Sequence, residues 1–178
     1  EKRVIAAGRY AYQKGFDLLS QAWNKVEKAC PDWQLTVCGM GDRTPYEQLA
    51  EQLGLDRGRC RLEGPVPDIQ EAYCQSSLFV FSSRFEGFGM VLVEAMSCGL
   101  PVVSFACPCG PRDIVADGED GLLVENGDVE RLAEAMIRLM RDDDLRRRMS
   151  ATAQVRVQRF RMESLAEQWR QVFDSLYR

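Results

Sequence analysis

The chain has 178 residues, of which 46% are hydrophobic and 28% charged, and its formal net charge at pH 7 is -4. This composition is typical of one globular domain with a substantial core and excludes a disordered chain. The acidic balance argues against a nucleic-acid-binding surface, and no apolar run is long enough for a membrane-spanning helix.

In chain order, the first half alternates apolar runs of strand length with segments whose apolar residues recur every three or four positions. In the first of these segments Phe16, Leu19, Trp23 and Val26 share one face, which predicts an amphipathic helix. The predicted elements are strand 3–8, helix 16–29, strand 34–38, helix 45–53, strand 59–62 and helix 69–74.

The central stretch reads as a buried strand, a polar turn, a helix and a second buried strand. Its turn contains two glycines, Gly87 and Gly89, both of which we expect to be free to adopt positive φ. Such a unit places the turn at the carboxyl edge of a parallel sheet, where open α/β folds bind ligands and a helix N-terminus attracts anions. The predicted elements are strand 78–81, turn 86–89, helix 90–98 and a strand that begins at 102–103.

The last part of the chain is mostly helical. Asp142, Asp143 and Asp144 could be mistaken for a metal motif, but the arginines that follow them favour a capped helix N-terminus with acids at its positive end. The predicted elements are a helical fragment at 114–115, strand 121–124, helix 129–140, a helix after 142–144 and helix 164–177.

Strands that alternate with helices along the whole chain predict a single domain, residues 1–178. The expected fold class is α/β, Rossmann-like and doubly wound, with a mostly parallel sheet of about six strands flanked by helices.

Seven cysteines are scattered through these elements, and the chain contains no histidine. We expect buried, reduced thiols and a cytoplasmic protein, because the chain opens directly on a predicted strand without an apolar leader. Cys107 and Cys109 form the only close pair, and without histidine or a second pair they do not predict zinc. We therefore expect no metal.

Two cations flank the loop after the first predicted strand. Gly8 and Arg9 follow the strand, and Lys14 and Gly15 precede the first helix, so both charges belong to the same rim as the turn at 86–89. The planar fork of arginine and the point charge of lysine together suit a diphosphate. Solvated loop charges are the alternative, which the shared rim disfavours.

Two carboxylates, Glu86 and Glu94, frame the central turn and lie eight residues apart. The spacing alone is weak, because Glu63 and Glu71 repeat it. Glu94 falls about two turns into the predicted helix, among apolar neighbours, where a carboxylate can accept two hydrogen bonds from a vicinal diol such as that of a ribose. A solvated glutamate on a helix surface is the alternative.

The run FEGFGMVLVEAMSCGLPVV resembles the nucleotide-sugar-binding half of GT-B glycosyltransferases, especially the retaining enzymes of family 4. Their E-x7-E motif, its glycine-rich turn and the small-Gly-x-Pro-Val run that follows all match. Gly8-Arg9 with Lys14-Gly15 also matches the family's diphosphate-binding loop. One departure is Cys109, since many members have glycine at that position.

The resemblance implies that Arg9 and Lys14 bind the diphosphate of the donor, that Glu94 binds the ribose and that Glu86 contacts the sugar hydroxyls. Val66 matches the segment whose backbone faces the nucleobase. The implied catalytic residues are Arg9, Lys14 and Glu86. The implied donor-binding residues are Gly8, Arg9, Lys14, Val66, Glu86, Gly87, Phe88, Gly89, Met90, Val91 and Glu94.

The implied reaction is a retaining, metal-independent transfer of a hexose from a UDP- or GDP-sugar, of the kind used in polysaccharide biosynthesis, without a cofactor. The developing charge of the leaving nucleoside diphosphate would be stabilised by Arg9, Lys14 and the amides of Gly87–Gly89. The chain has no D-x-D motif at a strand end, which agrees with metal independence.

The resemblance covers only the second of the two GT-B domains. We therefore expect an acceptor-binding domain before Glu1, and a chain that binds donor but does not transfer sugar alone. Any membrane contact, at the inner face of the membrane, would be made through that missing domain. We also expect the last helix to leave apolar side chains uncovered: Phe160, Leu165, Trp169, Phe173 and Tyr177.

Three alternatives remain at this point. A nucleotide-sugar 2-epimerase shares the fold, but its acids and histidines cannot be placed here. A non-catalytic nucleotide-binding module would lack the cation pair or the two glutamates. A dinucleotide oxidoreductase would need a third glycine after Gly39 and Gly41, which the chain lacks, although both remain weak candidates for a turn near the donor.

Overall fold

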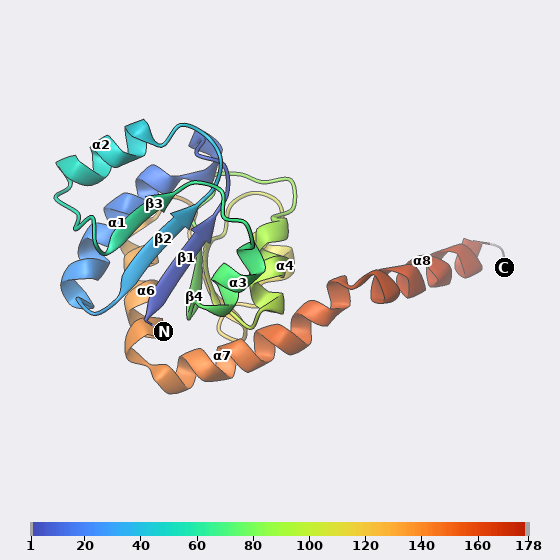
Figure 1. The fold of residues 1–178 in the computed structure, drawn as a ribbon. Helices are drawn as coiled ribbons and strands as arrows, with labels where there is room; N and C mark the ends of the chain where they lie inside the picture. Colours follow the sequence, from blue (N-terminus) through green and yellow to red (C-terminus); the bar gives the residue numbers. More distant parts are fainter. Residues whose placement is uncertain (1, 177–178) are drawn as a thin grey trace.

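Six parallel strands form the central sheet of the computed structural model, which describes residues 2–176 (Figure 1). Their order is β3-β2-β1-β4-β5-β6, and each pair of neighbours runs parallel. The chain winds outward in one direction from β1 and in the other from β4, as in a Rossmann fold. The strands are β1 (Arg3–Ala7), β2 (Gln34–Cys38), β3 (Cys60–Glu63), β4 (Leu78–Phe81), β5 (Val102–Phe105) and β6 (Gly121–Val124).

Helices connect these strands and then continue beyond the last one. The helical segments up to β6 are η1 (Tyr12–Lys14), α1 (Phe16–Ala29), α2 (Thr44–Gln52), α3 (Ile69–Cys74), α4 (Met90–Ser97) and α5 (Pro111–Ile114). Those after β6 are α6 (Val129–Arg141), α7 (Asp143–Arg156), η2 (Val157–Phe160) and α8 (Met162–Leu176).

Helices cover both faces of the sheet, because successive residues of a strand point to opposite sides. Val4 of β1 belongs to an apolar cluster with residues of α1 and α6, whereas its neighbour Ile5 belongs to a second cluster with residues of α3 and α4. The predicted α/β fold of about six mostly parallel strands is confirmed, and all six strands are parallel.

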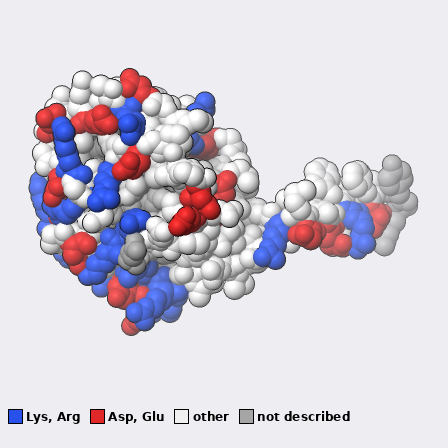
Figure 2. Space-filling view, in the orientation of Figure 1, with Lys and Arg blue, Asp and Glu red and all other residues white. Residues whose placement is uncertain are grey.

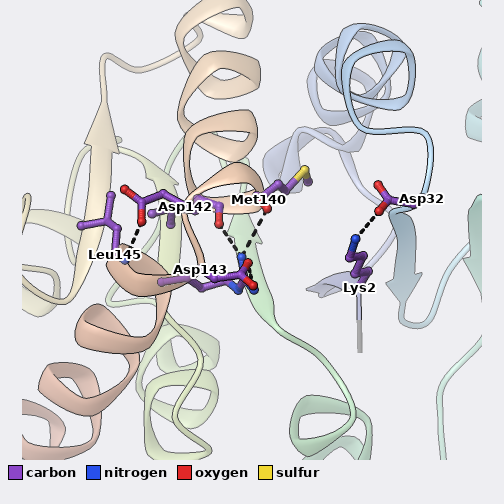
Figure 3. Close-up of polar contacts among 8 residues, drawn as sticks. Lys2, Asp32, Met140, Asp142, Asp143 and Leu145 are labelled. Atoms are coloured by element: carbon purple, nitrogen blue, oxygen red, sulfur yellow. Dashed lines mark hydrogen bonds and ion pairs between the residues drawn. The ribbon is translucent and has the colours of Figure 1, made fainter.

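Aspartates cap three of the helices. The Asp68 carboxylate accepts from the Glu71 amide at 3.0 Å at the start of α3, and the Asp128 carboxylate accepts from the Arg131 amide at 2.9 Å at the start of α6. At the start of α7, the Asp142 carboxylate accepts from the Leu145 amide at 2.8 Å. Figure 3 shows this last cap, with Asp143 beside it. The interpretation of the acidic triplet as a helix cap is therefore confirmed, and the aspartates need no metal to explain them.

The C-terminal helix α8 extends away from the body of the molecule (Figure 1), and none of its described residues is buried. Uncharged residues gather along one side of this arm and charges along the other (Figure 2). Trp169 is 62% exposed and Phe173 53%, so the prediction of uncovered apolar surface is confirmed for these two. Phe160 and Leu165 are half-buried, and Tyr177 lies outside the described residues. No helix within residues 2–176 combines the length and the apolar character needed to cross a membrane.

Several local expectations were wrong. Cys74 and Cys109 are exposed and Cys98 is only half-buried, because all three lie at the ends of short helices or in a loop and not inside strands. Gly87 does not adopt positive φ, although Gly89 does. The observed helix boundaries differ most from the predicted ones at two helices. α5 spans Pro111–Ile114, where a fragment at 114–115 was predicted, and α8 begins at Met162, where a start at 164 was predicted.

Candidate functional site

The carboxyl ends of β1 and β4 meet at the point where the strand order reverses. Open α/β sheets bind their ligands at this point, because the loops that follow the two strands diverge and leave a crevice. The backbone also approaches very closely here: a Cβ placed on Gly39, after β2, would lie 1.7 Å from the carbonyl oxygen of Gly8, after β1. The three loops after β1, β2 and β4 therefore form one rim.

Lys14 and Glu86 are brought together on this rim. The Lys14 Nζ lies 2.6 Å from the Glu86 Oε1, and their side chains are only 15% and 8% exposed. Ser83 donates its hydroxyl to the same Oε1 at 2.6 Å, and Gln13 donates to the Oε2 at 3.3 Å. Because three donors converge on one carboxylate, Glu86 is fixed in place and in turn fixes the ammonium group of Lys14.

Arg84 holds the loop that carries Lys14. Its guanidinium donates to both oxygens of Asp17, at 2.8 and 2.6 Å, and to the Tyr12 carbonyl at 2.7 Å. It also lies 4.0 Å from the centroid of the Tyr12 ring, while the Arg84 amide donates to the Gln13 carbonyl at 2.8 Å. These contacts tie η1 and the start of α1 to the end of β4.

The Arg84–Asp17 pair affects the acidity of Asp17. Burial alone would raise the pKa of its carboxyl group, but the hydrogen bonds and the positive charge of Arg84 outweigh burial and leave that pKa below the ordinary 3.8. Sequence reasoning missed this pair. Its only signal was an acid in the first turn of the first helix and a base before the central turn, which are 67 residues apart.

A cavity of about 290 Å³ opens beside this rim, between the ends of β1 and β2 and the helices α3 and α4. Glu94 is half-buried in its wall, and no hydrogen bond or ion pair with another described residue occupies its carboxylate. Arg9 is exposed at the cavity and is likewise unpaired among residues 2–176. The lining residues are Ala7, Gly8, Arg9, Cys38, Gly39, Met40, Pro65, Val66, Ile69, Tyr73, Val91 and Glu94.

The predicted site residues thus fall into two neighbouring groups. Five of them line the cavity, and the rest lie in the segments that follow β1 and β4, up to the first residue of α4. Within the turn, Gly89 caps α4 with a φ of 97°, while Phe88 and Met90 are exposed. The cavity group is Gly8, Arg9, Val66, Val91 and Glu94, and the loop group is Lys14, Glu86, Gly87, Phe88, Gly89 and Met90.

The N-terminus of α4 lies next to the cavity, since Val91 and Glu94 belong to its first two turns. No side chain caps this helix within the described part of the chain, so its first amides remain available to an anion. No cluster of three or more metal-binding side chains exists among residues 2–176. Cationic side chains and helix amides are therefore the groups on this rim that could bind an anionic ligand.

Cys109 lies in the loop after β5, beside the same turn, where the Glu86 amide donates to the Pro108 carbonyl at 3.3 Å. Its φ of 62° is the only positive value among the described residues other than glycine. This left-handed conformation favours glycine, which gives a physical reason why glycine suits this position better than the cysteine that this chain has.

A second hollow, of about 330 Å³, lies between α2 and β3. Its charged side chains are of both signs: Glu47, Glu51, Arg57, Arg61 and Glu63. It lies away from the point where the strand order reverses, and its wall mixes three acids with two bases. The cavity beside Glu94 is therefore the better candidate site.

Comparison with known proteins identifies a family and related structures. The family model described as "Glycosyl transferases group 1" matches residues 1–156. The phosphatidyl-myo-inositol mannosyltransferase of Mycobacterium leprae is 36% identical over 179 residues, which cover 98% of this chain and 47% of the relative. The amylovoran biosynthesis glycosyltransferase AmsD of Erwinia amylovora is 29% identical over 175 residues, covering 98% of this chain and 48% of the relative.

Solved structures show the same fold. A mutant of S. aureus TarM, in complex with fondaparinux, alpha-GlcNAc-glycerol and UDP, superposes with a TM-score of 0.90 at 28% identity, covering 97% of this chain and 35% of that one. Anabaena HepE in complex with UDP and glucose superposes with a TM-score of 0.86 at 26% identity, covering 98% and 48%. The chain thus spans about half the length of these relatives, or less.

Proposed function

The chain belongs to the group 1 glycosyl transferase family, and from that premise we propose that it is the donor-binding domain of a glycosyltransferase that uses a nucleoside diphosphate sugar. One observation carries the proposal: the cation of Arg9 and the unpaired carboxylate of Glu94 line one cavity at the carboxyl edge of the sheet, and the uncapped N-terminus of α4 and the Lys14–Glu86 pair lie in the elements beside it. These three features match the diphosphate and the ribose of such a donor.

In this proposal Arg9 binds the diphosphate, because its guanidinium is exposed at the cavity and unpaired within residues 2–176. Lys14 adds a second charge, which Glu86 holds at a fixed position 2.6 Å away. Among residues 2–176, the second oxygen of Glu86 accepts only from Gln13, at 3.3 Å, so it can also accept from a sugar hydroxyl. Glu94 accepts from the ribose, and Val66 lies against the base.

The proposed chemistry is retaining transfer without a metal. When the bond to the sugar breaks, negative charge grows on the departing nucleoside diphosphate. Arg9, Lys14 and the amides of Gly87–Gly89, together with the first turn of α4, would stabilise that charge from positions already fixed by the fold. A UDP-sugar is the first donor to test, because the TarM and HepE structures hold UDP.

We further propose that an acceptor-binding domain accompanies this one in the whole enzyme. The chain covers 47% and 48% of the two bacterial relatives. The apolar side of α8, with Trp169 and Phe173 exposed, would pack against that domain. On this basis the chain alone binds donor without transferring sugar.

Calorimetric titration of the chain with UDP, GDP and ADP tests the proposed donor site. We expect one nucleotide to bind, and Arg9→Ala or Glu94→Ala to weaken that binding about ten- to hundredfold, since each removes one charge-assisted contact. Arg147→Ala is the matched control, because Arg147 is an exposed arginine at the opposite edge of the sheet, beside the residues that precede β4 and β5. If none of the three nucleotides binds at millimolar concentration, or if Arg147→Ala weakens binding equally, the proposed function is wrong.

A further inference from the structure

Tyr73, in α3, is a buried residue with an unexplained polar group. Its side chain is 0% exposed, and its hydroxyl has no hydrogen-bond partner among the described residues. Buried hydroxyls in native proteins are nearly always hydrogen-bonded, so an orphan of this kind requires an explanation.

The same chain offers a direct comparison in Tyr10, which is also buried. Its hydroxyl lies 2.9 Å from the Val37 carbonyl and 2.9 Å from the Glu63 carbonyl, so the fold itself satisfies it. Tyr73 is packed just as firmly, with its ring edge-on to Phe79 at 5.7 Å between centroids, yet the fold supplies nothing for its hydroxyl.

The position of Tyr73 explains the difference. Among residues 2–176, four other residues have buried side-chain atoms that make no hydrogen bond, and two of these, Asp120 and Arg156, form an ion pair with each other at 3.0 Å. None of the four lines the cavity beside Glu94, whereas Tyr73 does. Burial raises the pKa of its hydroxyl, and the negative charge of Glu94 raises it further. The group therefore stays protonated at neutral pH and remains a hydrogen-bond donor close to a carboxylate.

The chemistry of a sugar hydroxyl fits a carboxylate and a tyrosine that line the same cavity. An ionised carboxylate only accepts hydrogen bonds, so a ligand hydroxyl bound to Glu94 must be the donor of that hydrogen bond. The oxygen of that hydroxyl still has lone pairs, which need a donor once the ligand is buried. The phenolic O–H of Tyr73 is such a donor in the wall of the cavity.

We propose that Tyr73 is a ligand-binding residue whose hydroxyl donates a hydrogen bond to the same ribose hydroxyl that donates to Glu94. This inference rests on the proposed function, since the ribose belongs to the nucleoside diphosphate. The free protein then leaves the hydroxyl unsatisfied, and the bound nucleotide satisfies it.

Tyr73→Phe tests this role with the ring and its packing retained. We expect UDP to bind about three- to tenfold more weakly, the effect of one neutral hydrogen bond. The thermal midpoint of the free chain should stay equal or rise, because an unsatisfied buried group is removed. Tyr10→Phe is the control and should do the reverse, with a lower midpoint and unchanged UDP affinity.

Deoxynucleotides identify the ligand hydroxyl. In the wild-type chain, either 2′-deoxy-UDP or 3′-deoxy-UDP should bind more weakly than UDP, and that loss should be smaller in Tyr73→Phe because the two groups form one hydrogen bond. Equal UDP affinity for wild type and Tyr73→Phe would overturn this inference alone. A lowered midpoint in Tyr73→Phe would also overturn it, because the hydroxyl would then support the fold. A wild-type chain that binds no nucleotide would overturn the proposed function and this inference with it.

Discussion

Glu86 is the most constrained carboxylate of the candidate site, with donors from Lys14, Ser83 and Gln13 around it. Taking such a charge out of water is costly unless it is paired and hydrogen-bonded. The fold meets that requirement fully at Oε1 and only weakly at Oε2. At the residue scale, this asymmetry identifies the oxygen that remains available to a ligand.

We predict that Glu86→Gln weakens the binding of a UDP-sugar but not the binding of UDP. The amide loses the charge that strengthens a hydrogen bond from a sugar hydroxyl, so a UDP-sugar that the wild-type chain binds more tightly than UDP should lose about tenfold in affinity. UDP itself, which has no sugar hydroxyl at that position, should bind as before. Calorimetric titration with both ligands measures the difference.

Glu71→Gln is the matched control for this experiment, because Glu71 has the same spacing from Glu63 but is exposed on α3. It should change neither affinity. A Glu86→Gln chain that loses UDP and UDP-sugar to the same extent would show that Glu86 acts on the diphosphate through Lys14 and not on the sugar.

Because of Asp17, the free energy of unfolding of the chain should fall at acidic pH. Its pKa is lower in the folded chain than its ordinary value of 3.8, so the pair with Arg84 stabilises fully above that pH and is lost as the pH falls below it. Asp17→Asn should lower the free energy of unfolding at pH 7 by about 1–2 kcal/mol, a value reduced for partial exposure. Urea unfolding at pH 7 and below pH 3.8 measures both values.

The difference between wild type and Asp17→Asn should begin to shrink below pH 3.8, where the carboxyl group of the unfolded wild-type chain takes up a proton, and should continue to shrink until the pH falls through the lower pKa of the folded chain. Asp32→Asn is the control, because Asp32 pairs with Lys2 on the surface, where both side chains are more than half exposed. It should have no measurable effect at pH 7. A difference for Asp17→Asn that stays constant down to pH 3 would contradict the ion-pair explanation.

At the scale of the elements, the close approach of the loops after β1 and β2 depends on a residue without a side chain. Gly39→Ala should lower the free energy of unfolding by about 2–4 kcal/mol, because its Cβ would lie 1.7 Å from the Gly8 carbonyl oxygen and the backbone must shift. Gly64, after β3 on the same edge, has nothing within 4 Å of its would-be Cβ, so Gly64→Ala should change that energy by less than about 0.5 kcal/mol. Equal effects in denaturant unfolding would show that the approach is not tight.

Helix α8 should contribute little to the stability of the isolated chain, since none of its described residues is buried. A truncation after Arg161 is expected to lower the free energy of unfolding by less than about 1 kcal/mol, as for surface changes. Equilibrium unfolding in urea gives the comparison. A loss above about 3 kcal/mol would mean that the apolar side of α8 packs on the body in solution.

Sequence patterns predicted most elements well, for reasons that are local. Helical periodicity identified α1 and α6, and aspartate caps marked the start of α7. The Arg84–Asp17 pair and the orphan hydroxyl of Tyr73 could not be predicted in this way. Each depends on how the sheet topology places side chains that are distant in the sequence. No local sequence pattern indicates which distant residue an arginine or a tyrosine will contact.

At the scale of the whole molecule, the strand order explains why residues from distant parts of the chain share one rim. β1 and β4 are neighbours in the sheet although about seventy residues separate them, so the loops after them converge on one crevice. The sequence predicted this edge from alternating elements alone. It could not predict the cavity beside it, whose walls come from α3 and α4 and depend on how those helices pack.

The most direct test of the central claim is a crystal structure of the chain with UDP. We predict that the nucleoside lies in the cavity beside Glu94 and Tyr73, and that the diphosphate contacts Arg9 and the amides at the start of α4. UDP bound instead in the hollow between α2 and β3, among Glu47 and Arg61, would contradict it. So would crystals soaked at millimolar UDP that show no nucleotide at the carboxyl edge of β1 and β4.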